Sequence, residues 1–256
     1  MIAQLALGLA LAYWLRRKPR RYAALAAAAF ALLAVGVVLT AMRTVLVAFA
    51  AGALAVAWRA GAAHRTWRAE DDKRARVVVT GMVAAAVVLV LALGAFSVWR
   101  TRAGGALRLG DASSSTRLRV ATVAASRTML HPFFGHGMDS AHRHWREWGF
   151  PGDDMLHAHS TPVQLAFERG LPAVAFWLWL VAACWTVCAR AEKIWRDADS
   201  PAAHGLMLGA TGAVAGLFAS SLVNYNFGDA EVTLLLWWLT GAAVALANDK
   251  VLRTED

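Results

Sequence analysis

Residues 170–189 read GLPAVAFWLWLVAACWTVCA, an apolar run without a charged side chain between Arg169 and Arg190. A helix needs roughly 20 such residues to cross the hydrocarbon core of a bilayer, so this run predicts a membrane span. The whole chain agrees with this interpretation, because 59% of its 256 residues are hydrophobic and its mean hydropathy is +0.47. Soluble domains average about 45–50% apolar residues.

Further runs of similar composition cover residues 1–15, 22–41, 44–58, 77–98, 205–223 and 231–247. The first of them has no basic residue before it and a basic cluster after it, which is the reverse of a signal peptide, so we expect a helix there. The sequence thus predicts an all-α integral membrane protein with about seven transmembrane helices and a long, partly helical loop over residues 99–169.

Basic residues between these runs predict the topology. They concentrate in short links at residues 16–21, 59–76 and 190–196, and the positive-inside rule places such links in the cytoplasm. The intervening links then lie on the opposite side without conflict, at residues 41–43, 99–169 and 224–231. The net charge of +9 is accounted for by topology and lipid headgroups, so we expect membrane lipids and not nucleic acid as partners.

Several polar side chains in the outer links suit group transfer. Arg43 stands alone between two apolar runs, where a charge either reaches the outer interface or binds an anion. The long loop contains a candidate surface helix at residues 116–130, with helix-capping residues before it and Pro132 after it. It carries three arginines, and six of the eight histidines lie in the same loop: Arg117, Arg119, Arg127, His131, His136, His142, His144, His157 and His159.

Arginine donates paired hydrogen bonds to pyrophosphate, and histidine can take a proton from a sugar hydroxyl near neutral pH. The alternative interpretation is a solvated basic loop near anionic headgroups. A metal site is a further alternative, because two H-x-H pairs stand near two aspartates: His142 with His144, His157 with His159, and Asp153 with Asp154. Aromatic side chains in the loop suit either sugar stacking or anchoring at the interface: Trp145, Trp148 and Phe150.

Two cysteines, Cys184 and Cys188, lie at helical spacing inside an apolar run. We expect them to be buried packing residues and not a disulfide or a metal pair.

Three stretches share a recognisable pattern. Residues 39–44 read LTAMRT, at the outer end of a predicted helix. Arg117 is followed fifteen positions later by Pro132, and then by Gly135 and Gly137.

The third stretch is the most specific of the three. Residues 157–164 read HAHSTPVQ and are followed by Glu168, Gly170 and Leu171. Together the three stretches resemble the membrane family of O-antigen ligases and polymerases, which transfers glycans from undecaprenyl pyrophosphate to an acceptor on the periplasmic face of the bacterial inner membrane.

The resemblance implies roles for particular residues. Arg43 and Arg117 would hold the pyrophosphate and stabilise the charge that leaves, while His159 would activate or orient the acceptor hydroxyl. Apart from the resemblance, the chemistry of their side chains makes Arg127 and His157 candidates for substrate binding. The acceptor would be lipid A core or another lipid-linked glycan, with no metal, cofactor or nucleotide-sugar donor required. The active site would face the periplasm.

The resemblance also implies a domain organisation. It covers roughly residues 36–247, including the loop at 99–169, and leaves N-terminal membrane helices at 1–35 and a cytoplasmic tail at 248–256. Because family members commonly have around ten or more membrane helices, most of those that precede the first arginine stretch have no counterpart here, and the chain is interpreted as a fragment, a chain with a misassigned start or a reduced paralogue. Two other functions stay open from the sequence: a transporter or flippase component for lipid-linked glycans, and a catalytically inactive partner subunit.

The predicted topology can be tested with fused reporters. A reporter fused near Glu70 should behave as cytoplasmic and one fused near Gly149 as periplasmic, because a single predicted span at residues 77–98 separates them. Alkaline phosphatase and green fluorescent protein activities would measure this. Both reporters on the same side would contradict the topology.

Overall fold

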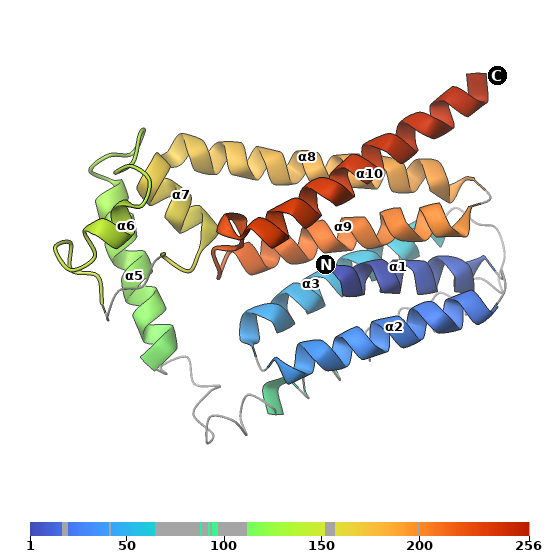
Figure 1. The fold of residues 1–256 in the computed structure, drawn as a ribbon, viewed down its shortest axis with the longest axis horizontal. Coiled ribbons are helices and arrows are strands. Elements are labelled where there is room, and N and C mark those ends of the chain that lie inside the picture. The colour runs from blue at the N-terminus through green and yellow to red at the C-terminus, as the bar shows by residue number, and fades with distance from the viewer. Residues whose placement is uncertain are drawn as a thin grey trace. The chain divides into compact units, whose positions relative to one another are not determined.

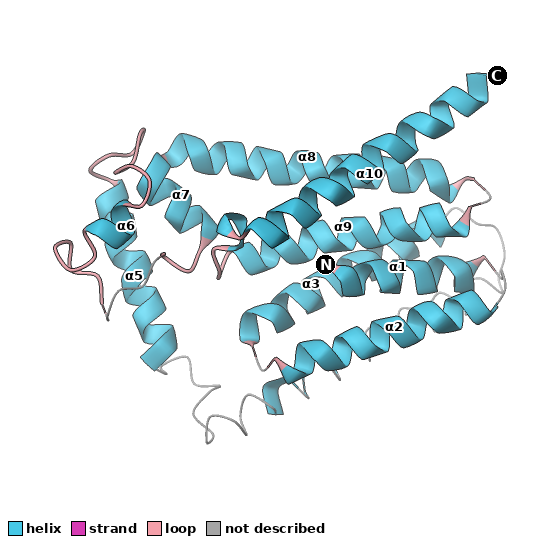
Figure 2. Ribbon diagram, viewed as in Figure 1, coloured by secondary structure: helices cyan, strands magenta, loops and turns pink. Residues whose placement is uncertain are grey.

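The computed structural model describes residues 1–16, 20–40, 42–64, 88, 92, 94–96, 112–151, 157–198 and 200–255. Within these ranges all regular structure is helical and no strand occurs (Figure 2), which confirms the predicted all-α class. The elements labelled in Figure 1, together with one short 3-10 helix, are α1 (Ile2–Leu15), α2 (Arg20–Leu39), α3 (Arg43–His64), α5 (Ala112–Thr128), α6 (Ser140–Arg143), α7 (Thr161–Arg169), α8 (Leu171–Arg196), α9 (Pro201–Ser221), η1 (Asn226–Gly228) and α10 (Ala230–Glu255).

Among the described residues, five helices are long and apolar enough to cross a membrane: α2, α3, α8, α9 and α10. Helix α1 is apolar but has 14 residues, fewer than the roughly 20 that a span needs. The predicted span at residues 77–98 lies almost wholly outside the described residues. The chain is therefore a multi-pass helical membrane protein, and the count of seven spans stays a prediction.

The chain divides into two compact units. The first comprises residues 1–98, 183–219 and 235–256, and the second comprises residues 99–182 and 220–234. Helix α9 is the most enclosed of the candidate spans, because 72% of the residues in its most apolar stretch are buried. Its glycines allow this, because a Cβ at Gly209 would collide with the backbone of α1 at Gln4 and Leu5. Close approach at small residues is a common way to pack helices in lipid.

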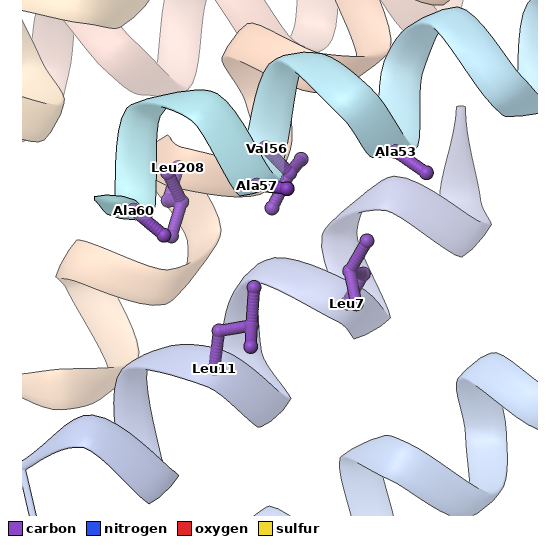
Figure 3. Close-up of a cluster of buried hydrophobic side chains, with 7 residues drawn as sticks. All are labelled: Leu7, Leu11, Ala53, Val56, Ala57, Ala60 and Leu208. Carbon is purple, nitrogen blue, oxygen red and sulfur yellow. The ribbon is translucent and has the colours of Figure 1, made fainter. Parts of the chain in front are cut away.

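The core of the first unit joins α1, α3 and α9 (Figure 3). The buried side chains of this cluster are Leu7, Leu11, Ala53, Val56, Ala57, Ala60 and Leu208. Alanine predominates on α3, so the helix presents a flat surface to its neighbours. The two cysteines are free and buried, as predicted.

A buried carboxylate organises one end of the first unit. Glu192 on α8 is fully buried and pairs with Arg59 on α3, with Arg196 at 3.2 Å and with His204 on α9 at 3.2 Å. Arg16, after α1, donates to carbonyl groups at the C-terminal end of α8. One arginine from each of the three basic links thus lies at this end. This arrangement agrees with the prediction that the three links share one side of the membrane.

The second unit contains the predicted loop helix. Helix α5 occupies residues 112–128, whereas the sequence predicted 116–130. It ends earlier because the amides of Leu130 and His131 donate to the carbonyls of Arg127 and Thr128 in a turn, at 3.0 and 3.1 Å. Helices α6 and α7 were not predicted separately, although the loop was expected to be partly helical.

The proline–glycine turn after α5 is hydrogen-bonded to the end of α7. The amide of His136 donates to the Phe167 carbonyl and that of Gly137 to the Glu168 carbonyl, both at 2.9 Å. The Leu171 amide donates in turn to the Pro132 carbonyl at 2.7 Å. Two of the motifs recognised in the sequence are therefore one structural feature, in which the turn is joined to the junction of α7 and α8.

Two glycines make this contact possible. Gly135 has φ 66° and Gly170 has φ 84°, a region that side chains other than glycine rarely adopt. A Cβ on Gly135 would collide with the backbone of Glu168 and Arg169, and a Cβ on Gly170 would collide with the carbonyl of Phe133. Glycine is therefore required here both for its conformation and for the space that it leaves.

Alanine substitution separates these two requirements. Gly137 also has a positive φ, of 94°, but a Cβ there would meet nothing within 4 Å. Both Gly135→Ala and Gly137→Ala should incur backbone strain of roughly 1–3 kcal/mol, while only Gly135→Ala adds a collision with α7. Hydrogen exchange of a peptide covering residues 132–139 should therefore accelerate more in Gly135→Ala. Equal acceleration in the two variants would contradict the packing explanation.

Candidate functional site

The His157–Thr161 segment leads directly into α7. Ser160 precedes the helix in an extended conformation and a proline occupies the first turn, a position that favours helix initiation. The side chain of Gln164, which is buried, accepts a hydrogen bond from the Ala158 amide at 2.7 Å. This bond holds the backbone between the two histidines, so the sequence HAHSTPVQ encodes a fixed turn followed by a helix.

His159 has an uncommon backbone conformation. Its φ is 49°, in the left-handed region, where histidine is found more often than most side chains but at a cost in strain. The imidazole is partly buried and meets the ring of His157 edge-on, with 4.5 Å between ring centroids. Strained residues of this kind cluster at functional sites, so His159 is a candidate for a role in binding or catalysis.

The electrostatic surroundings of His159 favour its neutral form. Burial lowers its pKa to about 4, with smaller contributions from the positive charges of His157 and Arg117. Arg117 lies exposed on α5, so α5 brings a guanidinium close enough to act on the imidazole. The charge of Arg117 therefore acts on His159, while the catalytic roles of both residues stay a prediction.

His157 joins His159 to a residue that the sequence did not single out. Its ring lies 5.7 Å from that of Tyr225, again edge-on, and its buried Nδ1 atom has no hydrogen-bond partner. The ring of Tyr225 lies against Gly228, where a Cβ would collide with it. Burial raises the pKa of Tyr225, although its hydrogen bond with Arg169 opposes this effect.

The turn that carries Tyr225 is hydrogen-bonded to the histidine segment. The carbonyl of Asn224 accepts from the amide of Thr161 at 3.2 Å and from its hydroxyl at 3.1 Å. Two links predicted on the outer side, 99–169 and 224–231, thus meet in the second unit. The sequence predicted that they share a side, but no local signal could pair Thr161 with Asn224.

Glu168 supports the site from the other end of α7. Its Oε1 accepts from the Asp139 amide at 2.9 Å. Burial raises the pKa of Glu168, partly offset by that hydrogen bond and by the charge of Arg169. The motif glutamate therefore joins the turn after Gly137 to α7, and no contact of Glu168 with the two histidines is seen.

Arg43 is the first residue of α3, in the first unit. Its side chain lies outside the described residues, so its role stays a prediction. The turn before it is shaped by Thr40, whose hydroxyl donates to the Val37 carbonyl at 2.7 Å and accepts from the Met42 amide at 3.4 Å. The threonine of this motif therefore has a structural role.

Arg127 and Trp148 form a cation–π contact. The guanidinium carbon of Arg127 lies 5.4 Å from the Trp148 ring centroid. The Nε2–H of His136 donates to the Arg127 carbonyl at 2.9 Å and so caps the end of α5. His136 is thereby assigned a structural role, while the predicted substrate contact of Arg127 stays a proposal.

The expectation for Trp145 and Phe150 was wrong. Both side chains are buried, and their rings stack on one another with centroids 4.5 Å apart. They pack with Phe167 in the core of the second unit, so neither is available to a sugar ring or to a membrane interface. The physical reason is that the loop folds around its own aromatic residues, because it needs an apolar core.

The histidines considered as metal ligands occupy separate contacts. His142 lies 3.6 Å from Asp139 and His144 lies 2.7 Å from Glu147. Within the described part of the chain, no group of three or more candidate metal ligands occurs. Residues 153 and 154, which entered the metal interpretation, lie outside the described residues.

The comparisons with known proteins identify a family. The family model for O-antigen ligase matches residues 28–178, more than half of the chain. The match includes Arg43, Arg117 and His159 and ends before the turn that carries Tyr225. A search of curated proteins gave no match.

The titration of His159 tests the electrostatics of the site. Its imidazole should titrate near pH 4, so it should be neutral at pH 5–7, and the fold should lose stability as pH falls from 6.5 towards 4. Arg117→Gln should move the midpoint upwards because one source of positive charge is removed. Arg119→Gln, on the same exposed helix, is the matched control and should not. NMR of ring-labelled histidine would measure this, and a wild-type midpoint near 6.5 would contradict it.

Proposed function

The chain belongs to the O-antigen ligase family, and on that premise we propose that it transfers a glycan from undecaprenyl pyrophosphate to a sugar hydroxyl. The acceptor is lipid A core in ligation or another lipid-linked glycan in polymerisation. Transfer takes place at the periplasmic face of the bacterial inner membrane. The observation that supports this most is the neutral, strained His159 within electrostatic reach of Arg117.

The proposed reaction needs a base and an anion-binding group side by side. The acceptor hydroxyl oxygen forms a bond to the anomeric carbon of the donor sugar, and the bond from that carbon to the pyrophosphate oxygen breaks. The hydroxyl proton passes to the neutral imidazole of His159, while the electron pair leaves with the pyrophosphate. Arg117 and Arg43 stabilise the charge on the leaving group through paired hydrogen bonds.

Donor binding would strengthen the base. A histidine whose pKa is about 4 is a weak proton acceptor, because efficient general bases have a pKa near the working pH. A pyrophosphate beside Arg117 would offset the positive charge that acts on His159 and would raise its pKa. The imidazole therefore becomes a better base when the pyrophosphate leaving group is in place. Proton transfer would thus be favoured only when the donor is bound.

The surrounding residues would orient the two substrates. His157, whose ring lies against that of His159, would help to orient a sugar hydroxyl, and Arg127 would contact the glycan near Trp148. Tyr225, whose ring lies beside that of His157, adds to this proposed binding surface a residue that sequence patterns did not suggest. Its hydroxyl is held by Arg169, so it presents a fixed polar group next to His157.

Substitution of the two central residues tests the proposal. His159→Ala should lower glycan transfer roughly a hundredfold or more, within the usual range for loss of acid–base catalysis, and donor binding should largely survive. Arg117→Lys should lower transfer roughly tenfold or more, because an ammonium cannot donate paired hydrogen bonds to pyrophosphate. Transfer would be measured with the purified chain in proteoliposomes, with lipid-linked donor and either acceptor, without ATP.

Matched controls are available in the same loop. His142→Ala and Arg119→Lys change exposed residues of the same types and should leave transfer near the wild-type rate. Near-normal transfer by His159→Ala would remove its catalytic role. Loss of activity with a chelator that is reversed by added metal would favour a metal site, and movement of the donor across the bilayer without transfer would favour a transporter component.

A further inference from the structure

Several apolar side chains around the proline–glycine turn of the second unit are exposed. Phe134 is 89% exposed and Phe133 is 70% exposed, although both are large and apolar. Met129, Leu130 and Met138 beside them in the sequence are 63–71% exposed. We call residues 129, 130, 133, 134 and 138 the apolar edge. Contiguous exposure of this kind marks a surface that meets another apolar phase.

The apolar edge is joined directly to the first turn of a membrane span. Its backbone is hydrogen-bonded to α8 through the Leu171 amide and the Pro132 carbonyl, at 2.7 Å. Gly170, just before α8, touches the carbonyl of Phe133 so closely that a Cβ would collide with it. The two phenylalanines are therefore attached at the depth where α8 begins.

The outward surface of α8 continues from this point. Leu171 is 50% exposed, Phe176 is 62% exposed and Trp179 is 61% exposed. An apolar helix long enough to span the bilayer presents such side chains to lipid. The turn that carries the apolar edge is thus hydrogen-bonded to the first residue of a helix whose exposed side chains are themselves apolar.

Helix α5, which precedes the apolar edge, also exposes uncharged side chains. Its exposed positions Leu118, Thr122 and Ala125, with Met129 just after its end, recur at helical spacing and carry no charge. Arg119, also exposed, stands one position from this stripe. A helix with an uncharged face beside cationic residues suits a position among lipid headgroups, with its apolar side towards the acyl chains.

We propose that the apolar edge inserts into the outer leaflet of the membrane beside α8, with Phe133 and Phe134 among the lipid acyl chains. The occupant of this surface is the bilayer itself, because the turn is hydrogen-bonded to the first residue of a helix that is long and apolar enough to span it. Insertion would fix the end of α5 at the membrane surface. This inference concerns position in the membrane and does not depend on glycan transfer.

Site-directed spin labelling tests the insertion. Phe134→Cys and Arg143→Cys would each be labelled in the full chain, and labelling of the wild type would check that the two native cysteines, which are buried, do not react. Arg143 is the matched control, with a side chain that is 71% exposed in the same unit. The probe membrane is a vesicle of phosphatidylethanolamine and phosphatidylglycerol without any polyprenyl lipid.

Power-saturation EPR would then compare collision with oxygen, which concentrates in lipid, and with a water-soluble nickel complex. The label at 134 should favour oxygen over nickel at least several-fold more than the label at 143. Equal access of nickel to both labels would overturn the proposal. Shielding of the label at 134 only after undecaprenyl phosphate is added would also overturn it, because the occupant would then be the donor's lipid chain. A label at Phe133→Cys provides a second reading if Phe134→Cys does not fold.

Discussion

Hydrocarbon offers no hydrogen-bond partner to a peptide group, and this constraint organises the chain. Every residue inside the five candidate spans is helical, which satisfies the backbone within each segment. Among the described residues, every positive φ falls between residues 135 and 170, in the loop outside the spans. Irregular backbone and the candidate chemistry therefore occupy the same part of the chain, because only there can a turn take its conformation from side chains and neighbouring loops.

The loop acquires order by hydrogen bonding its own backbone and by burying its own aromatic residues. The turn at Gly135 donates two amides to the end of α7, and the glycine at position 170 lets the two backbones touch. Trp145, Phe150 and Phe167 pack together in the core of the second unit. The result places Arg117 on α5 within electrostatic range of His159, which lies just before α7.

This arrangement explains why the histidine is a reasonable centre for chemistry. A solvated imidazole would keep its ordinary pKa, whereas burial holds His159 neutral and the charge of Arg117 adds to this effect. Neutrality leaves it ready to accept a proton. The neighbouring positive charge on Arg117 is suited to an anion, so a pyrophosphate would offset that part of the lowering of the His159 pKa, while the larger effect of burial would remain.

Local pattern was sufficient for much of this description. Apolar runs near the length of a bilayer predicted the spans, because membrane insertion depends on composition over about 20 successive residues. The motif at 157–164 predicted His159 as the candidate catalytic histidine. Tertiary structure alone showed that the turn from Pro132 to Gly137 joins α5 to the end of α7, that Trp145 and Phe150 are core, and that Tyr225 lies against His157. It also showed that Glu192, without a distinctive local signal, joins Arg59 to Arg196. These contacts link residues far apart in sequence, and their partners depend on how the chain folds back on itself, a property that no local window of residues contains.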